Sequence, residues 1–170
     1  REDGKINIDN TVVLGPKELD LGYKAAKILL EGTEFGVDII INKKIPIGSG
    51  LGGGSSNAAT ILMVLNSICS LNLKKNKLME LGLKLGADVP FFIFGNNAWV
   101  EGVGDKLKPI SIPEATFFIC IPDLSISTQS IFNSFELTKA SIPLKIPTYF
   151  DAESYNLATN DLERTVIKKH

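Results

Sequence analysis

The chain has 170 residues, of which 44% are apolar and 22% charged, and its formal net charge is −1 at pH 7. This is the composition of an ordinary folded domain, and the near-zero charge gives no general attraction to nucleic acid or to an anionic membrane. No apolar run reaches the roughly 18 residues that a membrane-spanning helix needs, and no secretory or transit segment is visible.

The first half of the chain predicts two helices with a strand between them. A helix begins at Pro16, carries apolar residues at helical spacing from Leu21 to Leu30, and ends at Gly32. Residues Val37–Ile41 are apolar enough to predict a buried strand. A glycine-rich loop follows. After it comes a second helix, from residue 58 to about residue 71, whose first turn is expected to be capped by a serine side chain.

The second half of the chain predicts shorter elements, each bounded by a glycine, a proline or a capping residue. They are a helix over 77–85 ended by Gly86, a hairpin of 98–102 and 106–110 through Gly104-Asp105, a strand over 116–121 ended by Pro122, a short helix from Ser127 or Thr128 to about Phe135, a loop over 141–150, and a last helix with a capping box from Asn160 to Glu163. Helices and strands without strict alternation predict the α+β fold class.

The glycine-rich loop is the most informative segment, with five glycines among the fifteen residues 46–60. Glycine lets backbone N–H groups approach a ligand, and a helix that starts at the end of the loop adds unpaired donors and the positive end of its dipole. The loop therefore predicts a phosphate cradle, although a flexible surface turn is the alternative. Its candidate residues are Pro46, Ile47, Gly48, Ser49, Gly50, Leu51, Gly52, Gly53, Gly54, Ser55 and Ser56.

Two well-known glycine loops fit poorly. A P-loop needs lysine after its last glycine, whereas Gly54 is followed by Ser55. The dinucleotide pattern G-x-G-x-x-G does fit residues 48–53, but that fold also needs an acidic residue about 20 positions on. No acidic residue occurs between Pro46 and Met79, so an oxidoreductase has little support.

Four motifs in the right order resemble the GHMP kinases, a family that phosphorylates small metabolites. They are Gly50–Ala59, Leu85–Phe92, Ala98–Gly104 and Asn160–Glu163, and the segment around Asp88 is the most specific. The resemblance implies a two-domain kinase. Residues 1–110 would be an ATP-binding catalytic domain lacking its N-terminal part, and residues 111–170 a partial substrate-binding domain. ATP and Mg²⁺ would be the cofactors.

The resemblance also implies the role of Asp88 as the base beside the acceptor hydroxyl, since phosphoryl transfer to an alcohol is helped by an oriented carboxylate. The alternative role for Asp88 is a helix N-cap. Ser55 and Ser56 are expected to cap a helix and also to offer hydroxyls to phosphate or metal. Lys43 and Lys44 are either solvated charges or phosphate contacts.

The family members that these motifs resemble most act on a cytidine diphosphate-linked methylerythritol, in the non-mevalonate route to isoprenoids. The resemblance implies this small molecule as the acceptor, with Thr128 and Phe132 beside its base. Phe132 could instead be a core residue. The alternatives are another GHMP kinase with a different acceptor, or a non-catalytic nucleotide-binding module. No nucleic-acid or membrane partner is expected.

The family also has an earlier segment with a lysine near the reacting phosphate and a later glycine-rich segment, and neither is found here. We therefore expect a fragment with little activity of its own. Cys69 and Cys120 fit no metal spacing and favour a reducing, cytoplasmic compartment. The only histidine is His170, so no histidine-based catalytic triad or metal site is expected.

Overall fold

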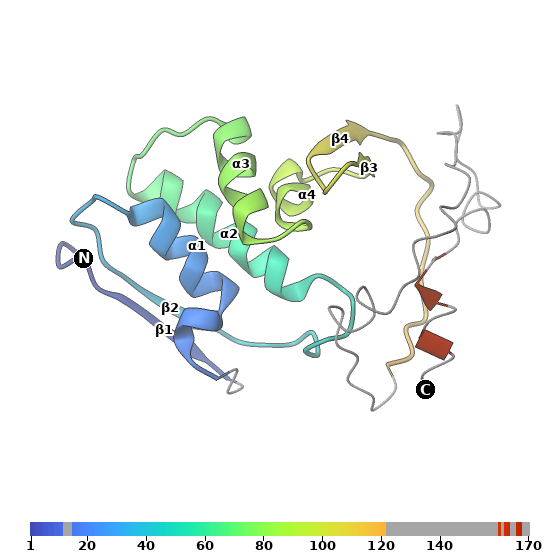
Figure 1. The fold of residues 1–170 in the computed structure, drawn as a ribbon, viewed down its shortest axis with the longest axis horizontal. Coiled ribbons are helices and arrows are strands. Elements are labelled where there is room, and N and C mark those ends of the chain that lie inside the picture. The colour runs from blue at the N-terminus through green and yellow to red at the C-terminus, as the bar shows by residue number, and fades with distance from the viewer. Residues whose placement is uncertain (12–14, 122–159, 161, 164–165, 168–170) are drawn as a thin grey trace. The chain divides into compact units, whose positions relative to one another are not determined.

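A computed structural model describes residues 1–11, 15–121, 160, 162–163 and 166–167 (Figure 1). The chain divides into two compact units, Arg1–Ile110 and Ser111–His170. All the strands and long helices described lie in the first unit. In chain order they are β1 (Ile6–Asn10), the 3₁₀ turn η1 (Lys17–Leu19), α1 (Leu21–Leu30), β2 (Val37–Ile41), α2 (Gly53–Ile68), α3 (Lys75–Leu85), α4 (Val89–Phe94), β3 (Ala98–Glu101) and β4 (Lys106–Pro109).

Strands β1 and β2 form a parallel pair connected by α1, with Ile6 opposite Val37 and Asn10 opposite Ile41. Residues alternate between the two faces, as the pleat of a strand requires. The strand predicted over Val37–Ile41 is confirmed with the same bounds, but the prediction that it is buried was wrong on one face, because Ile40 is 80% exposed. Only one face of this pair is covered by a helix in the described part of the chain, so alternate residues of β2 remain on the open face.

The core lies between the helices and is built on small side chains. Ala25 and Ala26 of α1 and Ala58 and Ala59 of α2 are all 0% exposed, which lets the two helices approach closely. Leu62 of α2 fills the centre of this cluster. Helices α3 and α4 complete it with Leu78, Val89 and Ile93. Each fully buried aliphatic side chain contributes about 1.5–3 kcal/mol, so this cluster fixes the directions of the helices that carry the site.

Helix α1 begins five residues later than predicted. Asp20 has extended backbone angles, and its carboxylate accepts hydrogen bonds from the N–H groups of Gly22 at 2.7 Å and Tyr23 at 3.2 Å. Pro16 instead precedes the separate turn η1. The sequence signal at Pro16 was therefore a real turn signal, but the side chain that begins the helix is Asp20.

The predicted helix over 77–85 and the predicted hairpin are confirmed, the helix starting two residues early at Lys75. In the hairpin, Ala98 lies opposite Pro109 and Glu101 opposite Lys106. The strand expected over 116–121 is wrong: the structure assigns no strand there, and Phe118 is 93% exposed. An apolar sequence alone does not make a strand, since a strand also needs ladder hydrogen bonds.

Near the C-terminus, the capping role of Asn160 is confirmed in part, since its carboxamide oxygen accepts a hydrogen bond from the Leu162 N–H at 3.1 Å. The expected helix from Ser127 or Thr128 and the loop over 141–150 lie outside the described residues. No helix within the described ranges is long and apolar enough to cross a membrane.

A polar network lies on the open face of the β1–β2 pair. Asp38 accepts a hydrogen bond from the Asn7 side chain at 2.7 Å and pairs with the Arg1 guanidinium, which also contacts Asp3 at 2.8 Å. The Asn7 hydrogen bond and the Arg1 side chain lower the pKa of Asp38 below its usual value of 3.8. The network is solvent-exposed, so its effect on stability is small.

Candidate active site

The glycine-rich loop leaves β2 at Ile41 and turns through three glycines with positive φ. These are Gly48 at +73°, Gly50 at +74° and Gly52 at +67°. A side chain placed on Gly48 or Gly50 would have nothing within 4 Å, so the backbone there is open to a ligand from outside. Positive φ at three alternate positions explains why the sequence places glycine at each.

Helix α2 begins directly at the end of this loop, with Gly52 in the N-cap position and no side-chain cap. Its first helical hydrogen bond runs from the Ser56 N–H to the Gly52 carbonyl at 2.8 Å. Among the described residues, the N–H groups of Gly53, Gly54 and Ser55 donate to no partner. Unpaired donors at the positive end of a sixteen-residue helix are an anion-binding arrangement.

The prediction that Ser55 or Ser56 caps α2 was wrong. The helix starts at Gly53, so both serines lie within the first turn rather than before it. Both serines are half-buried. Within the described part of the chain their hydroxyl groups make no hydrogen bond, although the backbone of Ser56 does. Both hydroxyls are therefore available to a ligand at the helix end.

The three glycines at the start of α2 each allow a different part of the structure to approach. A Cβ on Gly53 would lie 3.3 Å from Ile45, just before the loop, and one on Gly54 would lie 3.5 Å from Leu21 of α1. A Cβ on Gly52 would lie 2.9 Å from two ring atoms of Phe92 on α4. The start of α2 is thus held against the preceding segment, α1 and α4 at once.

Asp88 lies between α3 and α4, in the position immediately before α4. The turn is closed by a hydrogen bond from the Val89 N–H to the Gly86 carbonyl at 3.1 Å. Asp88 occupies the expected N-cap position, but its side chain accepts no capping hydrogen bond. The residue is exposed, whereas Val89 and Pro90, which follow it, are buried. The turn therefore holds the Asp88 backbone in place, while the Asp88 carboxylate is exposed and makes no hydrogen bond or ion pair with any described residue.

Helix α4 connects Asp88 to the glycine-rich loop. Phe92 lies one turn after Asp88, and its N–H donates to the Asp88 carbonyl at 3.5 Å. The ring of Phe92 also packs against Gly52, at the start of α2. No local sequence pattern predicts this contact, which places the start of α2 against the helix that Asp88 begins. A glycine facing an aromatic residue across two helices is visible only in three dimensions.

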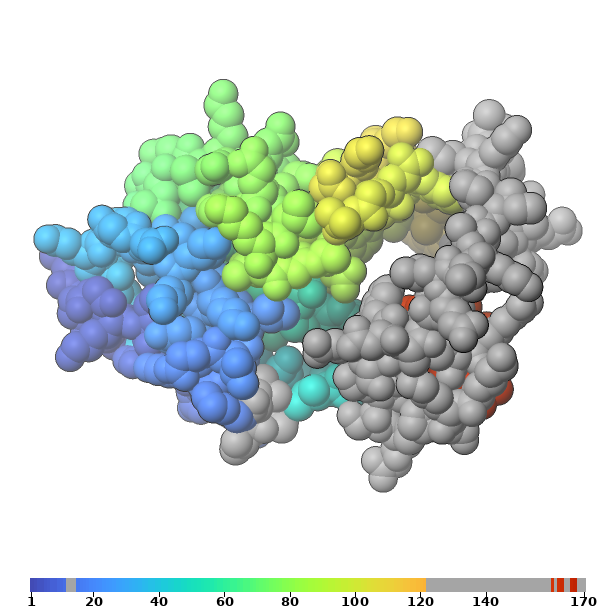
Figure 2. Space-filling view, viewed as in Figure 1, coloured from blue at the N-terminus to red at the C-terminus, as the bar shows by residue number. Residues whose placement is uncertain are grey.

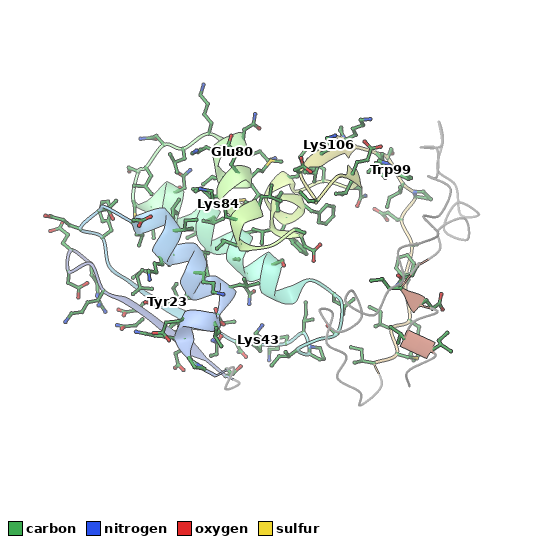
Figure 3. The ribbon with its side chains drawn as sticks, in the orientation of Figure 1. Tyr23, Lys43, Glu80, Lys84, Trp99 and Lys106 are labelled. Carbon is green, nitrogen blue, oxygen red and sulfur yellow. The ribbon has the colours of Figure 1, made fainter. Side chains whose placement is uncertain are left out.

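Lys43 and Lys44 lie between β2 and the loop, and Figure 3 labels Lys43 there. The backbone N–H of Lys43 donates to the Thr11 hydroxyl at 3.0 Å, which fixes this stretch to the end of β1. Neither ammonium group makes an ion pair in the described residues. The choice between solvated charge and phosphate contact therefore stays open for both.

The structure describes the loop residues 46–56 and Asp88, whereas Thr128 and Phe132 lie outside the described residues. No group of three or more histidine, cysteine, aspartate or glutamate side chains that could hold a metal occurs in the part of the chain that the structure describes. Any metal here would depend on oxygen ligands from a bound substrate as well as from the protein.

Comparison with known proteins agrees with this geometry. Residues 20–96, which run from the cap of α1 through the loop and α2 to the end of α4, match the family model described as the GHMP kinases N terminal domain. Over the full length of the chain, proteins named 4-diphosphocytidyl-2-C-methyl-D-erythritol kinase are 45% identical in Nitrosospira multiformis and 44% identical in Neisseria meningitidis serogroup A. Over residues 20–96 the chain is therefore similar to the N-terminal domain of the GHMP kinases.

A solved structure supports the same assignment of the fold. The chain matches a crystal structure of 4-(cytidine 5'-diphospho)-2C-methyl-D-erythritol kinase with a TM-score of 0.61 and 37% identity, over 76% of this chain and 47% of that one. The predicted α+β GHMP-kinase fold is thereby confirmed. The chain spans 57% of the length of the Nitrosospira relative and 60% of that of the Neisseria relative.

Proposed function

We propose that the complete product of the gene that encodes this chain transfers the γ-phosphate of ATP to a hydroxyl of 4-diphosphocytidyl-2-C-methyl-D-erythritol. The observation that carries the proposal is that the whole chain is 45% identical to a protein named as the kinase of that compound. The uncapped start of α2 and the unoccupied carboxylate of Asp88 supply the chemistry such a kinase needs.

The phosphates of ATP are assigned to the loop 46–56. The N–H groups of Gly53, Gly54 and Ser55 donate to phosphate oxygens, and the half-buried hydroxyls of Ser55 and Ser56 add further donors. The open backbone at Gly48 and Gly50 lets the chain wrap around the phosphates without side-chain interference. These donors fit a polyphosphate, which carries many acceptors and a concentrated negative charge.

Mg²⁺ fits the same place, because it prefers oxygen ligands and usually combines one or two protein oxygens with phosphate oxygens and water. The Ser55 and Ser56 hydroxyls, in the first turn of α2, are the protein oxygens that would hold it beside the phosphates. When bound, the metal neutralises charge on the transferring phosphate.

Asp88 is the proposed general base. The acceptor oxygen attacks the γ-phosphorus, the bond from that phosphorus to the bridging oxygen breaks, and ADP leaves. The proton of the acceptor hydroxyl passes to the Asp88 carboxylate. Because Val89 and Pro90 are buried and no capping bond occupies the carboxylate, Asp88 can hold the hydroxyl in one orientation throughout.

The two units of the chain are assigned different roles. Arg1–Ile110 carries the proposed ATP site and base, and Ser111–His170 the proposed substrate-binding part. Thr128 and Phe132 are proposed to contact the cytosine base, with the phenylalanine ring stacking on it. The enzyme is proposed to act in the cytoplasm, where the free thiols of Cys69 and Cys120 stay reduced.

The test is direct phosphorylation by the complete gene product. The protein is incubated with ATP, Mg²⁺ and one of four acceptors: the cytidine-linked methylerythritol, galactose, homoserine or mevalonate. Phosphorus NMR and mass spectrometry identify the product. We expect a new phosphate monoester on the first acceptor only. Phosphorylation of a different acceptor would show another member of the family, and ATP binding without any transfer would show a nucleotide-binding module.

A further inference from the structure

The tip of the β3–β4 hairpin lies directly against the turn that carries Asp88. Gly104, at the hairpin tip, has a φ of +95°. A Cβ at this position would overlap the carbonyl oxygen of Ala87 and lie 2.9 Å from its carbonyl carbon and 3.2 Å from its Cα. Figure 2 shows the hairpin, in yellow, packed against the yellow-green surface that precedes it. The two backbones therefore touch, with no side chain between them.

The peptide unit that Gly104 contacts is the one that joins Ala87 to Asp88. A peptide unit is planar, so a displacement of the Ala87 carbonyl rotates the Asp88 N–H and shifts the Asp88 Cα with it. On its other side, Asp88 is followed by the buried Val89, whose N–H is bonded to the Gly86 carbonyl at 3.1 Å. The turn is thus fixed from within by this bond and from outside by Gly104.

The hairpin tip cannot easily yield, because its own hydrogen bonds hold it. The Asp105 carboxylate accepts a hydrogen bond from the Val103 N–H at 3.0 Å. The pairing of Glu101 with Lys106 closes the loop at its base. A side chain on Gly104 would therefore push the Ala87 carbonyl rather than the hairpin alone.

We propose that Gly104 is a positioning residue for Asp88: its missing side chain lets the hairpin tip abut the Ala87 carbonyl and hold the base in the reactive orientation. The inference rests on the proposed role of Asp88 in phosphoryl transfer. It extends the site to a hairpin that carries no reacting group, and it gives a second reason for glycine at position 104, beside its positive φ.

Gly102 supplies a matched control from the same loop. Its φ is +70°, so alanine there also has to adopt a left-handed backbone conformation. The three atoms nearest to a Cβ on Gly102, however, all belong to the Asp105 carboxylate, the end of a flexible side chain, and none belongs to the Asp88 turn. This control therefore disturbs the hydrogen bond at the hairpin tip without pressing on Ala87. Any difference between the two alanine variants therefore reports the contact with Ala87.

The experiment measures kcat and both KM values for Gly104→Ala and Gly102→Ala in the complete gene product. A misplacement of about 1 Å can lower a rate about 100-fold, so we expect kcat to fall about 10- to 100-fold in Gly104→Ala and less than about threefold in Gly102→Ala. The KM for ATP should stay within about twofold in both. Equal kcat values at similar melting temperatures would overturn the inference.

A second arm asks whether Gly104 acts through Asp88. In an Asp88→Asn background, Gly104→Ala should cause no further loss of kcat, since residues that act as a unit are not additive. If the double variant instead lost kcat by the product of the two single losses, the inference would be overturned. If Gly104→Ala does not fold, Gly104→Asn replaces it, because asparagine tolerates a left-handed backbone better than alanine and its Cβ meets the same Ala87 carbonyl; an unchanged kcat would count against the proposal.

A failure of the proposed function can be distinguished from a failure of the inference about Gly104. A wild-type protein that transfers no phosphate, or an Asp88→Asn variant with full kcat, would remove the catalytic role on which the inference rests. The contact itself has its own readout, the amide NMR shift of Asp88. That shift should change in Gly104→Ala and not in Gly102→Ala, whatever the activity.

Discussion

Replacing Gly52 with alanine tests whether the start of α2 is held against α4. The φ of Gly52 is +67°, and a Cβ there would lie 2.9 Å from two atoms of the Phe92 ring. An L-residue in this left-handed conformation costs about 1–2 kcal/mol, and overpacking a close contact adds about 1–3 kcal/mol. Gly48→Ala is the matched control, because its φ is +73° but its Cβ would meet nothing within 4 Å.

The predicted difference between the two variants is therefore the overpacking cost alone, about 1–3 kcal/mol. For a chain of this size, each kcal/mol lowers the melting temperature by about 2–4 °C, so Gly52→Ala should melt about 2–12 °C below Gly48→Ala. Circular dichroism melts of the 170-residue chain measure this, and adding Phe92→Leu to Gly52→Ala should recover part of the difference. Equal melting temperatures for the two single variants would refute the contact between α2 and α4.

Three further predictions concern the loop, the acceptor and the exposed network. Gly53→Val should weaken ATP binding in a titration while the protein stays folded, because its Cβ would lie 3.3 Å from Ile45 and the crowding would shift the unpaired N–H groups; unchanged affinity would argue against a phosphate cradle. Phe132→Ala should raise the KM of the acceptor and leave that of ATP unchanged, since stacking on a base contributes about 1–3 kcal/mol, and the reverse pattern would place Phe132 elsewhere. Hydrogen bonding from Asn7 and pairing with Arg1 lower the pKa of Asp38, so its stabilisation is present above pH 3.8 and is lost as the pH falls through the lower folded-state pKa. Asp38→Asn should therefore melt slightly below wild type near neutral pH and converge with it in strong acid, and a gap that widens on acidification would contradict this sign.

The order of elements around the site could be predicted from the sequence because local signals specify it. The glycine-rich run breaks any regular structure before α2, and Gly86 ends α3 just before Asp88. The capping details could not be predicted in the same way. Asp20 begins α1 and Gly52 begins α2, although Pro16 and Ser55 carry typical start signals, because cap positions depend on where the packed helix face begins.

Burial and long-range contacts could not be predicted because they depend on tertiary neighbours. Ile40 has a sequence environment typical of a buried strand, yet it lies on a face that no described helix covers. The contacts of Gly52 with Phe92 and of Gly104 with Ala87 join segments far apart in the sequence. Glycine was expected at Gly52 for a phosphate and at Gly104 for a turn. In the structure each also admits a neighbouring element.

The most direct measurement of the central claim is the turnover of Asp88→Asn in the complete gene product. Asparagine keeps the size of the side chain, and the Asp88 carboxylate makes no capping bond that could be lost, so the melting temperature and the KM for ATP should hardly change. Loss of general-base assistance should lower kcat by about 10²–10⁴-fold. A variant that melts like wild type and keeps nearly full kcat would contradict the assignment of Asp88 as the base.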